Sequence, residues 1–162
     1  MSKENYDIVE NNNESVLVKG NDVKVIDAEF VFVGPIVFDI GVLIANFIFS
    51  AIIHWDSNIG FSRWILSEIS ELFKSVNNVK IEKNFEFDLN NSIRDILGQA
   101  GIEVFRRILG IAHLEDFTSL SPKLKNEKEL KALEVASDFI LLPEKDYSTD
   151  IVFDIINNIL SK

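Results

Sequence analysis

The sequence predicts a mainly α-helical fold with a short β-hairpin near its N-terminus. Two observations carry this prediction. The spacing of apolar residues changes from about two to about 3.6 after Gly34-Pro35, which marks a passage from strands to helices. Hydrophobic residues make up 47% of the 162 residues, and 13 of these are Phe, so the chain is able to bury a sizeable core. The length corresponds to one domain.

The predicted hairpin comprises two short apolar runs, 15–18 and 23–26. Lys19-Gly20-Asn21-Asp22 lies between them and is a strong turn signal. Residues 1–14 are rich in Asn and Glu, and this composition predicts a flexible lead-in. An aromatic run, 30–33, follows the hairpin and ends at the Gly-Pro pair.

About five helices are expected after the hairpin, because apolar residues recur at intervals of three and four. The first is apolar on nearly all sides and should be central. The second should bury a stripe formed by Trp64, Ile65, Ile69, Leu72 and Phe73. The expected helices are Asp39–His54, Phe61–Val76, a long helix with apolar positions from Ile93 to Ala112, Glu127–Leu142, and a last helix capped by Ser148 or Thr149 that ends at Leu160.

Composition excludes several functional classes. The chain has 26 acidic and 16 basic residues and a net charge of −10, which argues against nucleic-acid binding. It has no Cys, which excludes disulfides and suits a cytoplasmic location. The polar, acidic start predicts no signal peptide. Asp39 and Asn46 interrupt the apolar stretch 36–53, so a buried core helix is expected rather than a membrane span, which needs about 20 apolar residues.

Asp27 and Glu29 are a candidate metal site at the end of the second predicted strand. Residues i and i+2 of a strand project to the same face, where two carboxylates repel each other unless a cation lies between them. Such oxygen ligands suit Mg²⁺. The alternative is an exposed strand end that carries two ordinary acidic side chains.

Arg106 and Arg107 are a second candidate, inside the long helix. Arg107 is expected to border the core stripe, and Arg106 to point further outward. The pair has two interpretations: a solvated pair bonded to Glu103 at i+3 or i+4, or a clamp for a phosphoryl group. A glycine costs about 1 kcal/mol inside a helix, so close approach of another backbone or a ligand is expected at Gly98, Gly101 and Gly110.

Asp39 opens the first apolar helix and is most simply its N-cap. It could also hold a neighbouring loop through backbone N–H groups. His54 and His113 are the only histidines, and their separation argues against a histidine metal site, so both are interpreted as structural.

Two blocks of the sequence resemble methylthioribose kinases. Residues 24–41 are similar to the family pattern V-I-D-P-E-F-A-F-Y-G-P-x-G-F-D-I-G, and residues 101–113 to G-x-E-x-x-R-R-x-x-G-x-A-H. The two blocks keep the family's order. The likeness extends from about Ser15 to the C-terminus.

The resemblance implies that residues 15–162 are the C-terminal lobe of a protein-kinase-like fold. It also implies an ATP-dependent transferase that phosphorylates 5-methylthioribose on its anomeric hydroxyl, in methionine salvage. Asp27 and Glu29 match the acids that hold Mg²⁺ against the ATP phosphates, and Arg106 and Arg107 match the pair at the sugar and transferred phosphoryl group. Asp39 matches an acid that braces the catalytic loop.

The sequence also departs from the family pattern. Ala28 replaces a proline, and Val33 and Val37 replace a tyrosine and a glycine. The catalytic loop H-G-D-L-H-x-G-S should end near Ser15, yet residues 1–14 contain no such loop and Glu10 falls at the place of the catalytic Asp.

No catalytic base is therefore assigned, and the family's N-terminal lobe has no counterpart. We expect a truncated or split kinase that is inactive alone. The alternative is a non-catalytic helical interaction module, derived from such a kinase, that forms homodimers or pairs with a separate N-terminal-lobe chain.

Overall fold

The structure is a computed structural model of residues 1–162, in which residues 7–8, 16–20, 22–25, 34–78, 88–110, 114–145 and 147–161 are described. By their internal contacts the residues form two units, Met1–Gly34 and Pro35–Lys162, and each is considered by itself. The predicted boundary between a lead-in 1–14 and a lobe 15–162 stays a prediction.

The first unit contains a three-stranded antiparallel sheet in the order β1-β2-β3, formed by Asp7–Ile8, Val16–Lys19 and Asp22–Val25. β2 and β3 pair Val16 with Val25 and Lys19 with Asp22, and Gly20 directly follows β2 in a turn. Gly20 has φ +58°, in the left-handed region that glycine adopts readily because it lacks a Cβ. The predicted hairpin is confirmed, and β1 adds a short strand beside β2.

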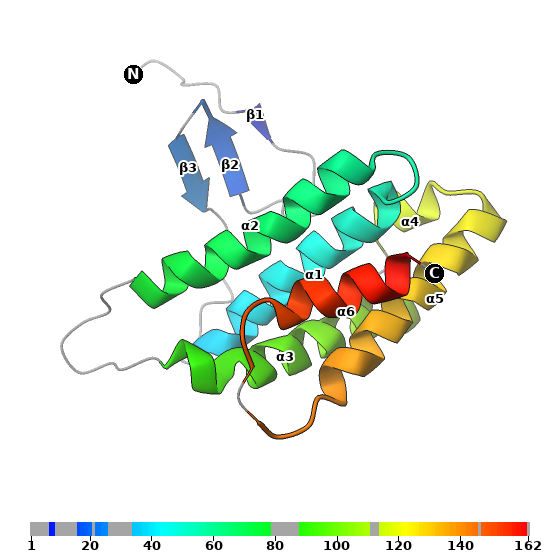
Figure 1. The fold of residues 1–162 in the computed structure, drawn as a ribbon. Coiled ribbons are helices and arrows are strands. Elements are labelled where there is room, and N and C mark those ends of the chain that lie inside the picture. Colours follow the sequence, from blue (N-terminus) through cyan, green and yellow to red (C-terminus); the bar gives the residue numbers. More distant parts are fainter. Residues whose placement is uncertain are drawn as a thin grey trace, which may run out of the picture. The chain divides into compact units, whose positions relative to one another are not determined.

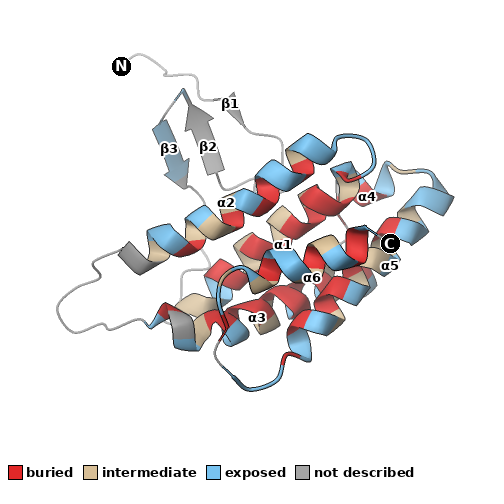
Figure 2. Cartoon of the chain, in the orientation of Figure 1, coloured by how far each residue is buried: buried red, intermediate tan, exposed pale blue. Residues whose placement is uncertain are grey.

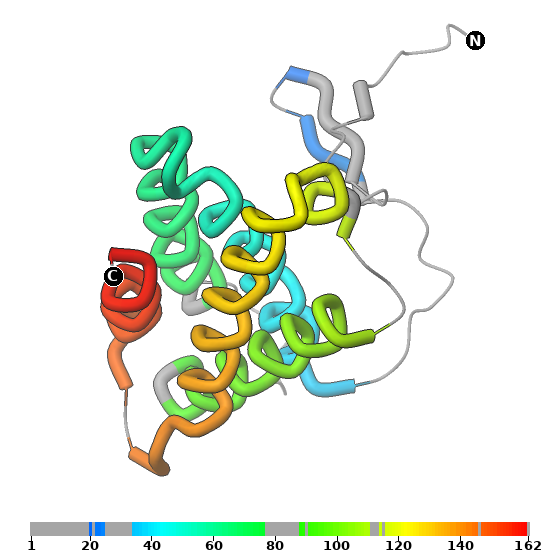
Figure 3. The backbone as a smooth tube through the Cα atoms, turned by 90° about the vertical axis from the view of Figure 1, so that its right-hand side faces the viewer, coloured from blue at the N-terminus to red at the C-terminus, as the bar shows by residue number. Residues whose placement is uncertain are grey.

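The second unit is helical (Figure 1). α1 packs against α2, α3 and α5, and α3 packs mainly between α1 and α5. α5 also contacts the short α4 and the C-terminal α6 (Figure 3). The helices are α1 (Ile36–His54), α2 (Ile59–Asn78), α3 (Leu89–Leu109), α4 (Glu115–Thr118), α5 (Pro122–Ile140) and α6 (Ile151–Leu160).

Three helices begin earlier than the apolar pattern predicts, and in two of them a proline explains the difference. α2 begins at Ile59, two residues before the predicted Phe61. α1 begins directly after Pro35, so Asp39 lies in its first turn and is not its N-cap, contrary to the prediction. α5 begins at Pro122 after Ser121 instead of at Glu127. A proline fixes φ near the helical value and lacks the N–H that a first turn leaves unpaired, so it suits a helix start.

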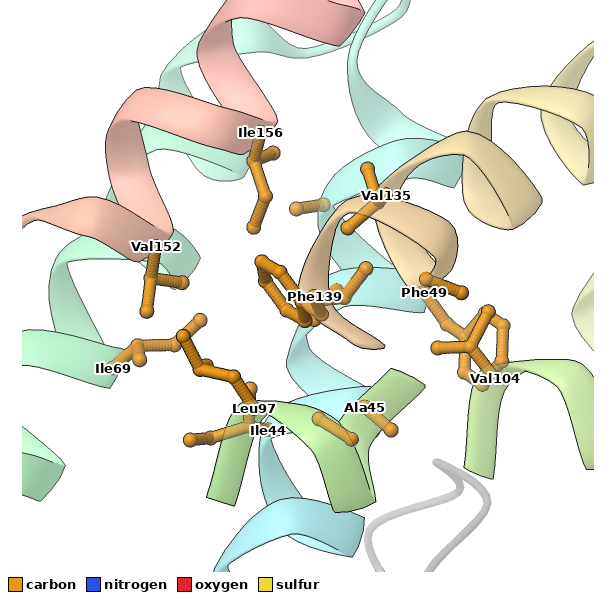
Figure 4. Close-up of a cluster of buried hydrophobic side chains, with 14 of the residues drawn as sticks. Ile44, Ala45, Phe49, Ile69, Leu97, Val104, Val135, Phe139, Val152 and Ile156 are labelled. Carbon is orange, nitrogen blue, oxygen red and sulfur yellow. The ribbon is translucent and has the colours of Figure 1, made fainter. Parts of the chain in front are cut away.

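The core runs through the second unit, and Figure 2 shows the buried positions along the inward faces of its helices. Figure 4 shows the ring of Phe139 amid apolar side chains of α1, α2, α3 and α6. On α3, every apolar position predicted for the core stripe within the described residues is buried: Ile93, Ile96, Leu97, Ala100, Val104 and Ile108.

One predicted core residue of α2 is misplaced. Ile65, Ile69 and Phe73 are buried as expected, but the side chain of Trp64 is 52% exposed. Adjacent helical positions lie about 100° apart, so Trp64 falls beside the stripe that Ile65 begins. Its ring instead packs against Phe61, with 5.6 Å between ring centroids.

α1 is long and apolar enough, by length and composition, to cross a membrane. In the structure it lies in the core: Ile44, Ala45, Ile48, Ala51 and Ile52 are fully buried against the surrounding helices. This packing agrees with the expectation of a core helix.

Two glycines let the central helices approach each other closely. A Cβ on Gly41 of α1 would lie 2.6 Å from the Cβ of Gln99 and 2.9 Å from the carbonyl oxygen of Ile96 on α3. A Cβ on Gly101 of α3 would lie 2.7 Å from the carbonyl oxygen of Ala136 on α5. The predicted close approach is therefore confirmed at Gly101, whereas nothing lies within 4 Å of the Cβ position of Gly98.

Polar contacts fasten the helices at their ends. The ammonium of Lys128 on α5 is buried and donates a 2.5 Å hydrogen bond to Asp56, in the turn between α1 and α2. The Nε of Arg94 donates to the carbonyl oxygen of Leu142, 3.1 Å away. With the Gly101–Ala136 contact, this bond shows that α3 and α5 run in opposite directions.

The two glycines of α3 give a matched test of this packing. Gly101→Ala should lower the free energy of unfolding by about 1–3 kcal/mol, because the new methyl group collides with backbone of α5. Gly98→Ala should raise it by up to about 1 kcal/mol, because alanine favours the helix and the space is open. Urea unfolding of both variants measures the difference, and equal effects would contradict the close crossing.

Candidate functional site

A charged cluster lies near the C-terminal end of α3 and consists of Glu103, Arg106 and Arg107. Arg106 donates two hydrogen bonds to Glu103, from Nε to Oε2 and from Nη2 to Oε1, each 2.6 Å long. Arg107 donates from Nε to Oε1 of the same carboxylate at 3.0 Å. One carboxylate therefore binds both guanidinium groups.

Helix geometry produces this arrangement, since residues three and four apart on a helix are neighbours. Glu103 precedes the two arginines by these two intervals, so its carboxylate lies within reach of both. Its side chain is 9% exposed, compared with 53% for Arg106 and 25% for Arg107. The predicted outward direction of Arg106 and the bordering position of Arg107 are confirmed.

The glycines on either side of the cluster have separate structural roles. Gly101 permits the crossing with α5. Gly110 ends the helix, and its N–H donates to the carbonyl oxygen of Arg106 at 3.0 Å. A Cβ on Gly110 would clash with that same oxygen, so a side chain there would displace the C-terminal end of α3, next to the arginines.

Burial of Glu103 works to raise the pKa of its carboxyl. The hydrogen bonds and positive charges of Arg106 and Arg107 outweigh this effect, and the pKa is held below its ordinary value of 4.5. The hydrogen bond to Glu103 in turn raises the pKa of Arg106. At neutral pH the cluster therefore carries two positive charges and one negative charge.

The hypothesised metal ligands, Asp27 and Glu29, lie outside the described residues, so the geometry of that pair stays a prediction. Among the residues that the structure describes, no group of three or more His, Cys, Asp or Glu side chains could hold a metal ion.

Asp39 is exposed in the first turn of α1, and its side chain forms no hydrogen bond or ion pair with a described residue. It lies two residues before Gly41, where α1 crosses α3 between Ile96 and Ala100. The arginines follow Ala100 by six and seven positions, or roughly 9–10 Å along α3 at 1.5 Å per residue. The crossing with α1 and the arginine pair therefore lie at different points along α3.

The histidine interpretation is tested at one position. His54 is exposed at the end of α1, and its ring packs edge-on against Phe61 with 5.0 Å between centroids. This contact agrees with a structural role. His113 lies outside the described residues.

The burial of Glu103 is the functional feature that sequence reasoning missed. The i+3 and i+4 spacing predicted a bond to the arginines, but it did not predict that one sheltered carboxylate serves both. The sequence did contain a signal for this burial: Glu103 follows the core position Ala100 by three residues and directly precedes the core position Val104.

Fold and site together define a mostly helical protein that presents a guanidinium pair, held by one buried carboxylate, at the end of a central helix. No protein-family model matches the chain.

Curated proteins that the chain resembles are methylthioribose kinases. The protein of Bacillus velezensis is 30% identical over 135 residues, which cover 78% of this chain and 34% of that protein. The protein of Geobacillus thermodenitrificans is 33% identical over 67% of this chain and 30% of its own length. That of Escherichia coli O45:K1 is 28% identical over 78% and 38%.

These similarities confirm the resemblance drawn from the two sequence blocks: the chain is a relative of the methylthioribose kinases. It spans about a third of the length of these curated relatives.

The lowered pKa of Glu103 predicts a pH dependence of stability. A carboxyl whose pKa is depressed by folding contributes stability above its unfolded value, and this contribution is lost as the pH falls through the folded value. The gap in unfolding free energy between the wild type and Glu103→Gln should therefore be widest near neutral pH and shrink below about pH 4.5.

Urea unfolding from pH 7 to pH 3 measures this gap. Asp56, whose pKa is also lowered, is present in both proteins and cancels in the difference. Glu71→Gln, which removes an exposed carboxylate from its i,i+3 pair with Lys74, should change stability by less than about 1 kcal/mol throughout. A gap of the same width at pH 3 and pH 7 would contradict the assignment.

Proposed function

We propose that the chain forms the metal- and substrate-binding part of an ATP-dependent, cytoplasmic methylthioribose kinase that acts in methionine salvage. The observation that carries the proposal is the cluster on α3: two arginines are held side by side by one buried carboxylate, within the second block that resembles the family. The similarity to methylthioribose kinases over 67–83% of the chain supports it.

In this proposal the fold of residues 15–162 corresponds to the C-terminal lobe of a protein-kinase-like enzyme. The mainly helical second unit supports the assignment, since such lobes are helical. Asp39 would brace the catalytic loop. Its exposed carboxylate, in the first turn of α1, has the access that such a contact needs.

Asp27 and Glu29 would hold Mg²⁺, because carboxylate oxygens are the ligands that this cation prefers. Bound Mg²⁺ would neutralise charge on the ATP phosphates. Phosphoryl transfer depends mostly on positioning and charge neutralisation. A cationic group is therefore also needed beside the transferred phosphoryl group, on the side that faces the sugar and not Mg²⁺.

Arg106 and Arg107 would be this cationic group and would bind the sugar and the transferred phosphoryl. A guanidinium has five N–H donors and matches the oxygens of a phosphoryl group bidentately. Arg106 uses two of its donors for Glu103, and Arg107 uses one. No other side-chain N–H group of these two arginines is bonded to a described residue, so several N–H donors remain for an anion.

Activity in this proposal requires residues beyond these 162, since no base is assigned in the chain and the match covers only 30–34% of the length of these relatives. The chain alone should show little or no turnover with methylthioribose and ATP. Loss of a positioned base alone typically removes a factor of 10² to 10⁴ in rate.

A chimera tests the activity directly. Residues of this chain would replace the matching 135-residue part of the Bacillus velezensis relative, and coupled ADP release would be measured. Normal turnover of the chain alone would contradict the requirement for further residues. An inert chimera that folds would contradict the proposed function.

Within an active chimera, Arg106→Lys and Arg107→Lys should each lower kcat by about tenfold or more, because lysine lacks the planar fork. Asp27→Asn and Glu29→Gln should raise the Mg²⁺ concentration required for half-maximal rate. Asp22→Asn, at an exposed position of the hairpin, is the control for the acid substitutions.

An interaction module is the second candidate, and one face of α3 favours it. Gly98, Ile102 and Leu109 are spaced by four and seven residues, so they share one face of α3 that points away from the core. The side chains of Ile102 and Leu109 are 53% and 69% exposed. Exposed apolar stripes of this kind mark contact surfaces.

In this second candidate the stripe would contact a second copy of the chain or a separate N-terminal-lobe chain. Light scattering should then report a dimer, and Ile102→Ser with Leu109→Ser should convert it to a monomer. A wild-type monomer that retains no partner in pull-downs would exclude this candidate.

A further inference from the structure

We propose that Glu103 is a positioning residue that fixes the orientation of both guanidinium groups for anion binding, although its own charge opposes that binding. This inference rests on the proposed function of the arginine pair as a phosphoryl-binding group. It assigns the role to a residue that does not itself touch the anion.

The geometry of the cluster carries the inference. Arg106 binds Glu103 bidentately through Nε and Nη2, and this fixes the plane of its guanidinium group. Arg107 binds the same carboxylate through Nε, so its terminal nitrogens extend beyond the contact. Two flexible side chains are thereby held in a defined relation by one shared acceptor.

The burial of Glu103 distinguishes it from the exposed ion pairs of this protein. In the exposed pair between Glu71 and Lys74, the carboxylate side chain is 60% exposed, against 9% for Glu103. A sheltered carboxylate is itself held in place, whereas an exposed one rotates freely and orients its partner weakly. The nearby backbone, capped at Gly110, adds to this rigidity.

The two possible roles of Glu103, as a charge and as a positioning residue, predict opposite changes in anion affinity when Glu103 is removed, and this allows a decisive test. If Glu103 acts only as a charge, its removal leaves two unneutralised cations, and an anion should bind more tightly. If Glu103 positions the guanidinium groups, its removal lets them rotate, and ordering them again costs affinity. The sign of the change in affinity separates the two roles.

The experiment measures the affinity of inorganic phosphate for the 162-residue chain by calorimetry at neutral pH. Glu103→Gln should weaken phosphate binding roughly tenfold, the size typical of losing a partner that orients a ligand-binding group. Glu103→Asp keeps the charge on a shorter side chain, and its phosphate affinity should fall between those of the wild type and Glu103→Gln. Glu71→Gln is the matched control, with the same charge change and an i,i+3 cation, and should leave the affinity unchanged.

A second readout reports on the arginines without any ligand. The Nε–Hε groups of Arg106 and Arg107 should give separate NMR resonances with slowed hydrogen exchange in the wild type. In Glu103→Gln they should approach the resonance of Arg63, an exposed arginine on α2. Unchanged resonances in this variant would show that it is folded and would overturn the positioning role, whatever its affinity for phosphate.

The two proposals fail in different ways. If Arg106→Lys and Arg107→Lys leave phosphate affinity unchanged, the arginine pair is not the phosphoryl-binding group and the proposed function fails, whereas the Nε–Hε spectra still decide the role of Glu103. Tighter phosphate binding by Glu103→Gln would overturn the positioning role and leave the arginine pair as a binding group.

Discussion

The structure of the helical unit depends on how closely three backbones approach one another around α3. Gly41 brings α1 onto the Ile96–Ala100 segment, and Gly101 brings α5 onto α3 one position later. Side chains of ordinary size would hold helix axes 8–10 Å apart, and a glycine at the crossing lets the axes come closer. Because the two contacts fall at adjacent residues of α3, this helix is clamped from two sides at its middle.

The clamp explains how one helix serves both the core and the candidate site. Up to Ala100, α3 contributes mainly to packing, with Ile93, Ile96 and Leu97 buried. Beyond the clamp it presents Glu103, Arg106 and Arg107 along one edge. The cluster therefore lies between two fixed features of the helix, the crossing at Gly101 and the helix end at Gly110.

The sequence predicts the buried face of some helices better than that of others, and predicts helix starts poorly, for physical reasons. On α3 a regular 3.6-residue period identified the buried face, because one continuous stripe meets the core. On α2 the same reasoning included Trp64 in error, since hydrophobicity outweighed its angular position. The starts of α1 and α5 differ from the predicted starts for another reason: the apolar period shows which face of a helix is buried, whereas Pro35 and Pro122 mark where these two helices begin.

Site prediction was limited in a different way. The intervals between Glu103 and the arginines were legible in the sequence, but burial is a property of the packed molecule and depends on neighbouring helices. The glycines illustrate the same limit. Gly98, Gly101 and Gly110 are alike in the sequence, yet the structure gives them an open surface, a helix crossing and a helix end.

The charge of the whole chain gives the cluster its significance. With a net charge of −10, the protein repels anions at long range, and this repulsion is screened beyond about 8 Å at physiological ionic strength. Any anion that the chain binds must therefore be held by contacts at short range, where the direction of each N–H donor matters more than net charge. A buried carboxylate that accepts hydrogen bonds from two guanidinium groups is consistent with this requirement, although it lowers the net positive charge of the cluster. In a strongly basic protein the same carboxylate would be of less use, because long-range attraction would already concentrate the anion.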